Sequence, residues 1–140
     1  MRKINEIMTR DVITVSPHDT LQTAARKMRD YDIGFLPVYE GDKLVGVLSD
    51  RDIVIRALAD GMDPKTKLNM ALVISSPAVY CFDDQTIDDA TDLMNDNQIR
   101  RLVILDRGNK QVAGVISLGD LAVHVGDKMS GEVLQSVSVP

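Results

Sequence analysis

A serine and an aspartate stand three residues apart at two places in this chain of 140 residues. Residues 46–52 read Gly-Val-Leu-Ser-Asp-Arg-Asp, and residues 114–120 read Gly-Val-Ile-Ser-Leu-Gly-Asp. An aspartate can accept hydrogen bonds from two vicinal ribose hydroxyls, and a serine can donate one to a phosphate. A helix that begins at such a pair also offers unpaired N–H groups, which favour a phosphate. The spacing therefore predicts a nucleotide site, with helix capping alone as the alternative.

Arg51 makes the two signatures unequal, because Gly119 has the matching position in the second one. Arginine can hold a phosphate through two parallel hydrogen bonds. The first signature therefore favours a phosphorylated ligand, unless Arg51 is a solvated surface residue. The glycine at the second signature would permit a closer approach of the backbone or would loosen the start of a helix.

A second pair of arginines precedes the second signature. Arg100 and Arg101 occupy the positions that Gly34 and Phe35 hold in the first half of the chain. Adjacent residues of an extended segment point to opposite faces, so we expect only one of the two arginines to face a cleft. The alternative is a salt bridge to the acidic surface.

The signatures belong to a longer internal repeat. The segment Thr-Leu-Gln-Thr-Ala that begins at Thr20 matches Thr-Ile-Asp-Asp-Ala at Thr86, 66 residues later, whereas Gly46 and Gly114 are 68 residues apart. Two residues are therefore inserted in the second copy, between turn-forming segments at 40–43 and 106–110. Loops tolerate insertions at small thermodynamic cost, so the alignment predicts two copies of one structural unit.

Each copy has the same predicted order of elements, β-α-β-β-α. In the first copy we predict a strand at 12–15, a helix capped by Thr20 or Asp19 and ending near 30–32, a hairpin of 35–39 and 44–48, and a helix from about 49 to 58 followed by Gly61. Pro37 should lie on an edge strand or at a strand start. In the second copy the strand is predicted at 78–81, the helices at 87–94 and 118–125, and the hairpin at 102–105 and 111–116. The predicted fold class is α+β, with two repeats (7–61 and 74–126) packed with pseudo-two-fold symmetry, a linker at 62–73 and a tail at 127–140.

Composition excludes several functions. The net charge of −5 argues against a general nucleic-acid or membrane-surface protein, which would need a basic face. The sequence contains no apolar run of about 20 residues, so we predict no membrane span. The N-terminal residues do not have the pattern of a signal peptide. The single cysteine, Cys81, rules out an internal disulfide and favours a reducing cytoplasm.

Nothing in the residue pattern predicts catalysis or metal binding. His18 and His124 lack the spacing of metal ligands, and Cys81 lies in an apolar strand where we expect it to be buried and inert. No glycine-rich phosphate loop with lysine is present. We therefore expect no catalytic residue, no metal and no cofactor, and we interpret the chain as a non-enzyme.

The chain resembles a tandem pair of CBS domains, the cystathionine-β-synthase-type module. The resemblance covers residues 7–125 and rests on Ile7-Met8-Thr9, the two Thr-(Leu/Ile)-x-x-Ala helix starts, the Ile-Arg-Arg-Leu-Val run at 99–103 and both serine–aspartate signatures. It implies two clefts between the copies that hold AMP, ADP, ATP, NAD or S-adenosylmethionine, and a flat homodimer of two pairs.

The resemblance also implies a role for the site residues. The serine takes phosphate, the aspartate takes ribose, and apolar segments hold the base, with Tyr80 either stacking on adenine or packing on the core. The chain would then be a regulatory, energy-sensing module acting through its dimer or through an unidentified protein partner. A ligand-free dimerisation scaffold is the alternative. The predicted ligand-binding residues are Ser49, Arg51, Asp52, Ser117 and Asp120, with Ile13, Thr14, Val15, Ile33, Gly34, Leu36 and Pro37 in the first copy and Val79, Tyr80, Cys81, Ile99, Arg100, Arg101, Leu102 and Val103 in the second.

Overall fold

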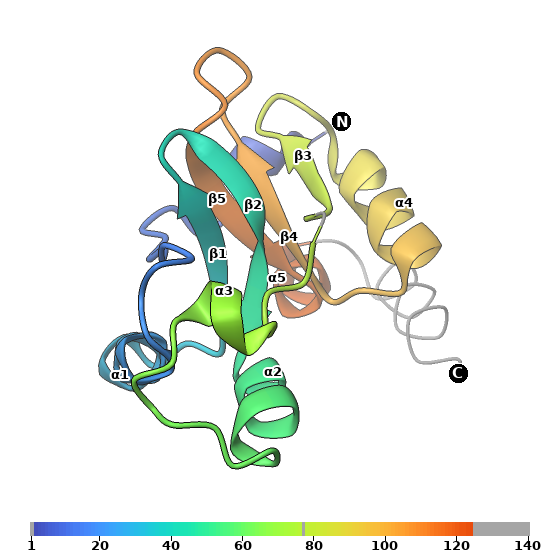
Figure 1. Ribbon diagram of the computed structural model, residues 1–140. Helices are drawn as coiled ribbons and strands as arrows, with labels where there is room; N and C mark the ends of the chain where they lie inside the picture. Colours follow the sequence, from blue (N-terminus) through green and yellow to red (C-terminus); the bar gives the residue numbers. More distant parts are fainter. Residues whose placement is uncertain (1, 77, 125–140) are drawn as a thin grey trace. The chain divides into compact units, whose positions relative to one another are not determined.

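A computed structural model describes residues 2–76 and 78–124 (Figure 1); the predicted tail lies outside them. It confirms the α+β class and the order β-α-β-β-α in the second copy, whereas the first copy has the order α-β-β-α. The first copy holds α1 (Leu21–Tyr31), β1 (Phe35–Glu40), β2 (Lys43–Ser49) and α2 (Asp50–Ile53), which continues as a π-helical turn, Val54–Leu58. A 3-10 turn (Ile4–Glu6) precedes this copy, and a short helix α3 (Leu68–Ala71) follows it. The second copy holds β3 (Tyr80–Phe82), α4 (Ile87–Asn97), β4 (Arg101–Leu105), β5 (Val112–Ser117) and α5 (Leu118–His124).

The first copy is built on a hairpin. β1 and β2 pair antiparallel around Gly41, whose positive φ of 60° suits a residue without Cβ. Pro37 lies inside β1, and it is tolerated there because the sheet has only two strands and β1 is an edge.

The strand predicted at 12–15 is wrong except for one residue. Val15 alone forms a parallel bridge, with Val38 of β1. The carbonyl of Thr14 accepts a hydrogen bond from Lys27 Nζ at 2.8 Å, so it is not available to a neighbouring strand. Local β propensity predicted a strand where tertiary contacts hold the backbone as a loop.

The helices begin where capping residues predict them. Thr20 caps α1 by accepting from the N–H of Thr23 at 3.1 Å. Thr86 and Asp89 form a capping box at the start of α4, with distances of 3.2 and 3.0 Å. Each helix lays an apolar stripe on its own sheet, with Leu21, Ala24 and Met28 buried in α1 and Ile87, Ala90 and Met94 buried in α4.

The second copy carries a three-stranded sheet of order β3-β4-β5. β3 is parallel to β4, and β4 is antiparallel to β5. The loop between β4 and β5 is longer than the turn between β1 and β2, which confirms that the inserted residues lie there. Asp106 orders this loop by accepting from the N–H groups of Gly108 and Asn109 at 2.8 and 3.1 Å.

The compact units of the structure do not follow the repeat boundaries. One unit is Ile13–Ala78, and the other joins the residues before Ile13 to those from Val79 onward. Thr9 pairs with Val115 beside β5, and Ser75 pairs with Val47 beside β2. Each repeat therefore begins with a short segment, which we call its returning segment, that pairs with the sheet of the compact unit that holds the other repeat.

These returning segments also contribute to the two cores. Ile4, Ile7 and Met8 are buried in the core that contains β4 and β5. Leu68 and Ala71 of α3, within the predicted linker at 62–73, are buried in the core that contains β1 and β2. No helix in the described part of the chain is long and apolar enough to cross a membrane.

Candidate functional site

Both serine–aspartate signatures form capping boxes at helix starts. Asp52 N–H donates to Ser49 Oγ at 3.1 Å, and Ser49 N–H donates to Asp52 Oδ2 at 2.9 Å. The same pair of bonds joins Asp120 to Ser117, at 3.1 and 2.8 Å. Capping is therefore a real role of these residues, and it fixes the rotamer of each aspartate.

The capping boxes leave part of each carboxylate for another partner. The side chain of Asp52 is 18% exposed, and its Oδ1 lies 3.8 Å from Nε of Arg56, which is a loose ion pair. Oδ1 of Asp120 accepts no hydrogen bond given by the described residues. Each serine hydroxyl accepts in the cap, so its own proton stays available to donate. Capping and ligand binding are thus compatible in one Ser-x-x-Asp unit.

The glycine that opens each signature is explained by close packing. A Cβ on Gly46 would lie 2.5 Å from the backbone oxygen of Ser75, and a Cβ on Gly114 would lie 2.7 Å from that of Thr9. These atoms belong to the returning segments. The glycines therefore admit the neighbouring backbone and do not act on a ligand.

The residues that face the two signatures differ in charge. Phe35 is the cross-strand partner of Ser49, and Arg101 is the partner of Ser117. Directly opposed residues of an antiparallel pair lie on the same face, with Cβ atoms about 4.5–5.5 Å apart. The residue opposite the serine is thus aromatic in the first copy and basic in the second.

The preceding position differs in the same way. The carboxylate of Asp50 lies directly over Gly34, because a Cβ there would be 2.8 Å from Asp50 Oδ2. The N–H of Asp50 donates to the carbonyl of Gly34 at 2.9 Å, and the N–H of Leu118 donates to that of Arg100 at 2.8 Å. These matching bonds identify Arg100 and Leu118 as the equivalents of Gly34 and Asp50.

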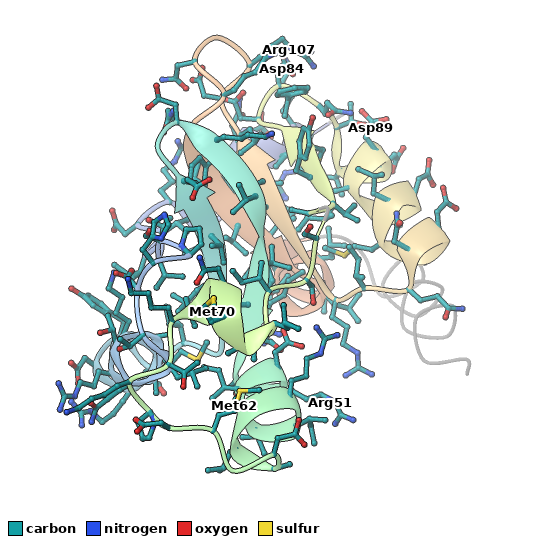
Figure 2. The ribbon with its side chains drawn as sticks, in the orientation of Figure 1. Arg51, Met62, Met70, Asp84, Asp89 and Arg107 are labelled. Carbon is teal, nitrogen blue, oxygen red and sulfur yellow. The ribbon has the colours of Figure 1, made fainter. Side chains whose placement is uncertain are left out.

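Arg51 is exposed on α2 (Figure 2) and forms no ion pair within the described residues. Sequence reasoning missed two charged neighbours of the first signature, Asp50 at the glycine and Arg56 at Asp52. The spacing Asp52 to Arg56, four residues on one helix, could have revealed the second of them.

Most of the residues predicted to line the base pocket are core residues. Ile13, Ile33, Val79 and Ile99 are half-buried against the two cores. Thr14 and Gly34 are also half-buried. A residue whose side chain is buried can offer a ligand only its backbone groups. The residues of this kind are Val15, Leu36, Pro37, Cys81, Leu102 and Val103.

Tyr80 packs against its own strand. Its ring meets Phe82 edge to face, with centroids 5.7 Å apart, and Arg107 lies 4.2 Å above the Phe82 ring. Arg107 also donates two hydrogen bonds, of 2.7 and 2.9 Å, to the carboxylate of Asp84. These hydrogen bonds lower the pKa of Asp84. Tyr80 is 44% exposed, so it does not pack on the core, and its stacking on adenine stays a prediction.

Cys81 is buried, as predicted. Burial raises the pKa of its thiol to about 12, and the nearby charge of Asp89 acts in the same direction. The neutral thiol therefore persists in the folded protein at physiological pH.

His18 pairs with Glu40 at 3.0 Å on the surface, while the side chain of His124 lies outside the described residues. The described part of the chain brings no three His, Cys, Asp or Glu side chains together around a possible metal ion.

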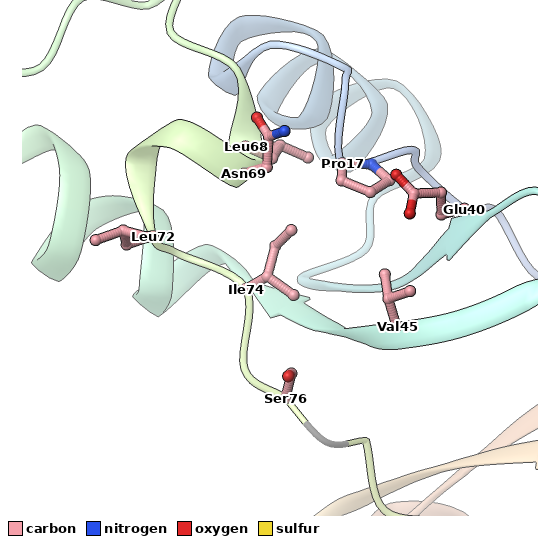
Figure 3. A pocket seen from close by; sticks show the side chains of 8 residues that line it. All are labelled: Pro17, Glu40, Val45, Leu68, Asn69, Leu72, Ile74 and Ser76. Carbon is pink, nitrogen blue, oxygen red and sulfur yellow. The ribbon is translucent and has the colours of Figure 1, made fainter.

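A pocket of about 300 Å³ opens in the Ile13–Ala78 unit, at the hairpin end of β2 (Figure 3). Val45, Leu68 and Ile74 give it an apolar wall, and Glu40 and Asn69 add polar groups. No residue of the serine–aspartate signature lines it, since Ser49 stands at the opposite end of β2.

The sequence matches the CBS domain family model twice, at residues 4–58 and 71–127. It is 39% identical to the CBS domain-containing protein YhcV of Bacillus subtilis over 139 residues, covering 99% of this chain and 96% of that protein. The crystal structure of hypoxic response protein I with two coordinated zinc ions has a TM-score of 0.75 and 34% identity, covering 89% of this chain and 99% of that one.

A second similar structure shows the fold alone. The CBS domain pair of protein MJ0100, in complex with 5′-methylthioadenosine and S-adenosyl-L-methionine, has a TM-score of 0.77 at 22% identity, covering 91% of this chain and 98% of that one. The two matches to the family model, the α-β-β-α order that both copies share and the paired capping boxes agree. This chain belongs to the CBS domain family.

Proposed function

We propose that this protein is a non-catalytic regulatory module that binds adenosine-containing ligands at its two serine–aspartate signatures. One observation carries the proposal: each capping box fixes an aspartate whose second oxygen points to no strong partner among the described residues. A fixed carboxylate that can still accept two hydrogen bonds is suited to the vicinal hydroxyls of a ribose.

The relatives support this ligand class. The CBS domain pair of MJ0100 was crystallised with two molecules that contain adenosine. The net charge of −5 agrees with a small-molecule ligand better than with a nucleic acid. The bound nucleotide acts here as a regulatory ligand and not as a cofactor, in a reducing cytoplasm that suits the neutral Cys81.

Regulation requires that ligand binding alters a surface that another molecule contacts. The π-helical turn after α2 exposes three large aliphatic side chains: Val54, Ile55 and Leu58 are 50, 53 and 68% exposed. An apolar helix face of this kind is self-complementary when two copies meet about a two-fold axis. We therefore place a homodimer contact on this turn, with a coupling to ligand of about 1–3 kcal/mol.

Titration calorimetry of the full chain with AMP, ATP, NAD and S-adenosylmethionine tests the ligand. We expect at least one of these to bind, and Asp52→Asn with Asp120→Asn together to abolish the heat. Absence of heat and of any thermal shift with all four would leave the ligand-free scaffold as the function.

The dimer has its own test. Light scattering after gel filtration should give a dimer for the natural chain and a monomer for Leu58→Glu. The matched variant Leu72→Glu changes a leucine elsewhere that is even more exposed, at 78%, and should leave the dimer intact. A Leu58→Glu protein that remains dimeric would remove the contact from this turn.

A further inference from the structure

We propose that the pocket in the Ile13–Ala78 unit is a second kind of binding site, which takes a small apolar carboxamide. Such a molecule has an aliphatic or aromatic body and one CONH2 group. The pocket has a volume of about 300 Å³, at the lower end of the range for small-molecule sites. None of its lining residues belongs to a serine–aspartate signature, so this site is independent of the proposed function.

The pocket is held open by backbone hydrogen bonds on both of its sides. On one side, the N–H groups of Leu68 and Asn69 in α3 donate to carbonyls of the 17–19 loop, at 2.9 and 3.0 Å. On the other side, Ser75 exchanges two hydrogen bonds with Val47 of β2, at 2.8 and 2.9 Å. The chain between these bonds crosses from α3 to β2 and borders the pocket. The site is therefore formed before a ligand arrives, which lowers the cost of binding.

Aliphatic side chains form one wall of the pocket. Leu68 is fully buried, and Val45 and Ile74 are half-buried against the same core. Core packing fixes such side chains in place, so a ligand that covers them gains apolar burial without having to order them. This wall suits an aliphatic or aromatic body.

Leu72 extends this wall toward solvent. Its side chain is 78% exposed, and its backbone (φ 56°, ψ 34°) is in the left-handed region, which costs a leucine free energy. The other non-glycine residues with positive φ in the described part of the chain are polar: Asp32, Gln98 and Lys110. Neither burial nor backbone conformation thus favours a leucine at this position, whereas a ligand in the pocket would cover its side chain.

Two polar side chains lie together across from the apolar wall. The carboxylate of Glu40 is held by a hydrogen bond of 3.0 Å between Oε2 and His18, and Asn69 is tied to the carbonyl of Pro17 through its N–H. Figure 3 shows Glu40 and Asn69 on either side of Pro17. Within the described residues, Glu40 Oε1 and the side-chain amide of Asn69 have no hydrogen-bond partner.

These two groups determine the class of ligand. Lys43 is the cross-strand partner of Glu40, and His18 is its hydrogen-bond partner, so hydrogen bonding and not net charge must distinguish one ligand from another. Glu40 Oε1 requires a donor, and the Asn69 amide can donate and accept. A carboxamide supplies a donor and an acceptor in one group. A carboxylate supplies acceptors only and would leave Glu40 without a partner.

The experiment is a methyl NMR titration of the full chain with cyclohexanecarboxamide and with cyclohexanecarboxylate, which share the ring and differ in the polar group. We expect the carboxamide to bind with a Kd of about 1 mM, the order expected for so small a ligand, and at least about tenfold more tightly than the carboxylate. The shift changes should be confined to the methyl groups of the pocket, those of Val45, Leu68, Leu72 and Ile74.

A variant of Leu72 separates binding from folding. Leu72→Gly should weaken carboxamide binding about threefold or more, because it removes apolar contact, yet it should not lower the stability, because glycine favours positive φ. Met70→Ala is the control, because Met70 is 72% exposed on the same helix but does not line the pocket. It should leave the affinity unchanged.

A variant of Glu40 tests the selection of the polar group. Glu40→Gln should remove most of the preference for the carboxamide, because a glutamine can also donate to a carboxylate. Asp60→Asn changes an exposed carboxylate that does not line the pocket and should preserve the preference.

The outcomes are separate from those of the proposed function. The protein that carries both Asp52→Asn and Asp120→Asn retains the pocket, so it should bind the carboxamide as tightly as the natural chain does. Unchanged pocket methyl signals, equal affinity for the carboxylate, or loss of binding in this double variant would each overturn the carboxamide site. None of these results would alter the test with nucleotides, and a failure of all four nucleotides would leave the carboxamide site in place.

Discussion

At the scale of single residues, the serine–aspartate pair serves structure and chemistry at once. Ser49 and Asp52 satisfy two N–H groups at the start of α2, and the same bonds hold the aspartate in one rotamer. A ligand that meets a preorganised carboxylate does not have to immobilise it. Helix capping and ligand binding are therefore compatible roles of the same pair of residues.

Removal of the carboxylate from one signature should separate these roles. Asp52→Ala loses the bond that the carboxylate accepts in the capping box, and it loses the ribose acceptor, so we expect about 1 kcal/mol less stability together with weaker nucleotide binding. Asp52→Asn should keep most of the stability, because the amide oxygen can still accept from Ser49 N–H, and should weaken binding. Urea unfolding and calorimetry measure the two effects. Equal nucleotide affinity in the natural and Asp52→Ala proteins would refute the ligand role of this residue.

Cys81 should be unreactive in the folded protein. Its folded pKa of about 12 lies above the value of about 8.5 for a free thiol, so the folded state keeps the proton where the unfolded state loses it. The stability from this group is complete below the unfolded pKa and falls as the pH rises toward the folded pKa.

An aromatic disulfide reagent at pH 8 should therefore modify Cys81 quickly in urea and slowly in buffer. The free energy of unfolding should fall less between pH 8 and pH 11 in Cys81→Ala than in the natural chain. Native protein that reacts as fast as the denatured protein would contradict the buried, neutral thiol.

At the scale of elements, the glycine that opens each signature belongs to sheet packing. Gly46 and Gly114 let the returning segments run close to β2 and β5, at Ser75 and Thr9 respectively. Each signature therefore combines a glycine that serves packing with a serine and an aspartate that cap a helix.

Alanine at these glycines should destabilise the protein. Gly46→Ala and Gly114→Ala would force backbone atoms apart, and we expect a loss of about 1–3 kcal/mol in urea unfolding. Gly119→Ala is the control, because its Cβ would meet nothing closer than Ser117 Oγ at 3.6 Å and alanine favours a helix. A Gly114→Ala protein as stable as Gly119→Ala would show that the segment does not pack so closely.

At the scale of the whole molecule, each half of the sequence contributes residues to the compact unit that holds the other half. Ile4 precedes the first repeat in the chain but is fully buried in the core of the second, while Leu68 is fully buried in the core of the first. Each core therefore depends on residues that lie outside the helices and strands of its own repeat.

Truncation of these two side chains should act on opposite sheets. Ile4→Ala and Leu68→Ala should each cost about 2–5 kcal/mol. Hydrogen exchange should show the loss first at Val115 N–H in Ile4→Ala and at Val47 N–H in Leu68→Ala, since these amides bond to the returning segments. Loss at the same amide in both variants would contradict the division into these units.

Much of the fold could be predicted because its signals are local. The caps at Thr20 and Thr86, the two hairpins and the position of the inserted residues all follow from neighbouring residue types. The strand at 12–15 could not, because whether an extended segment joins a ladder depends on a partner far away in the sequence.

For the candidate site, the sequence by itself determined the duplicated Ser-x-x-Asp pair, the unequal arginines and the order of elements that carries them. Only the tertiary structure decided that Arg101 faces Ser117 where Phe35 faces Ser49, that Asp50 covers Gly34, and that both opening glycines serve packing. The physical reason is the separation in sequence of the residues that interact. Helix caps and turns are settled within a few residues, whereas strand register and close backbone approach join residues that are distant in the chain.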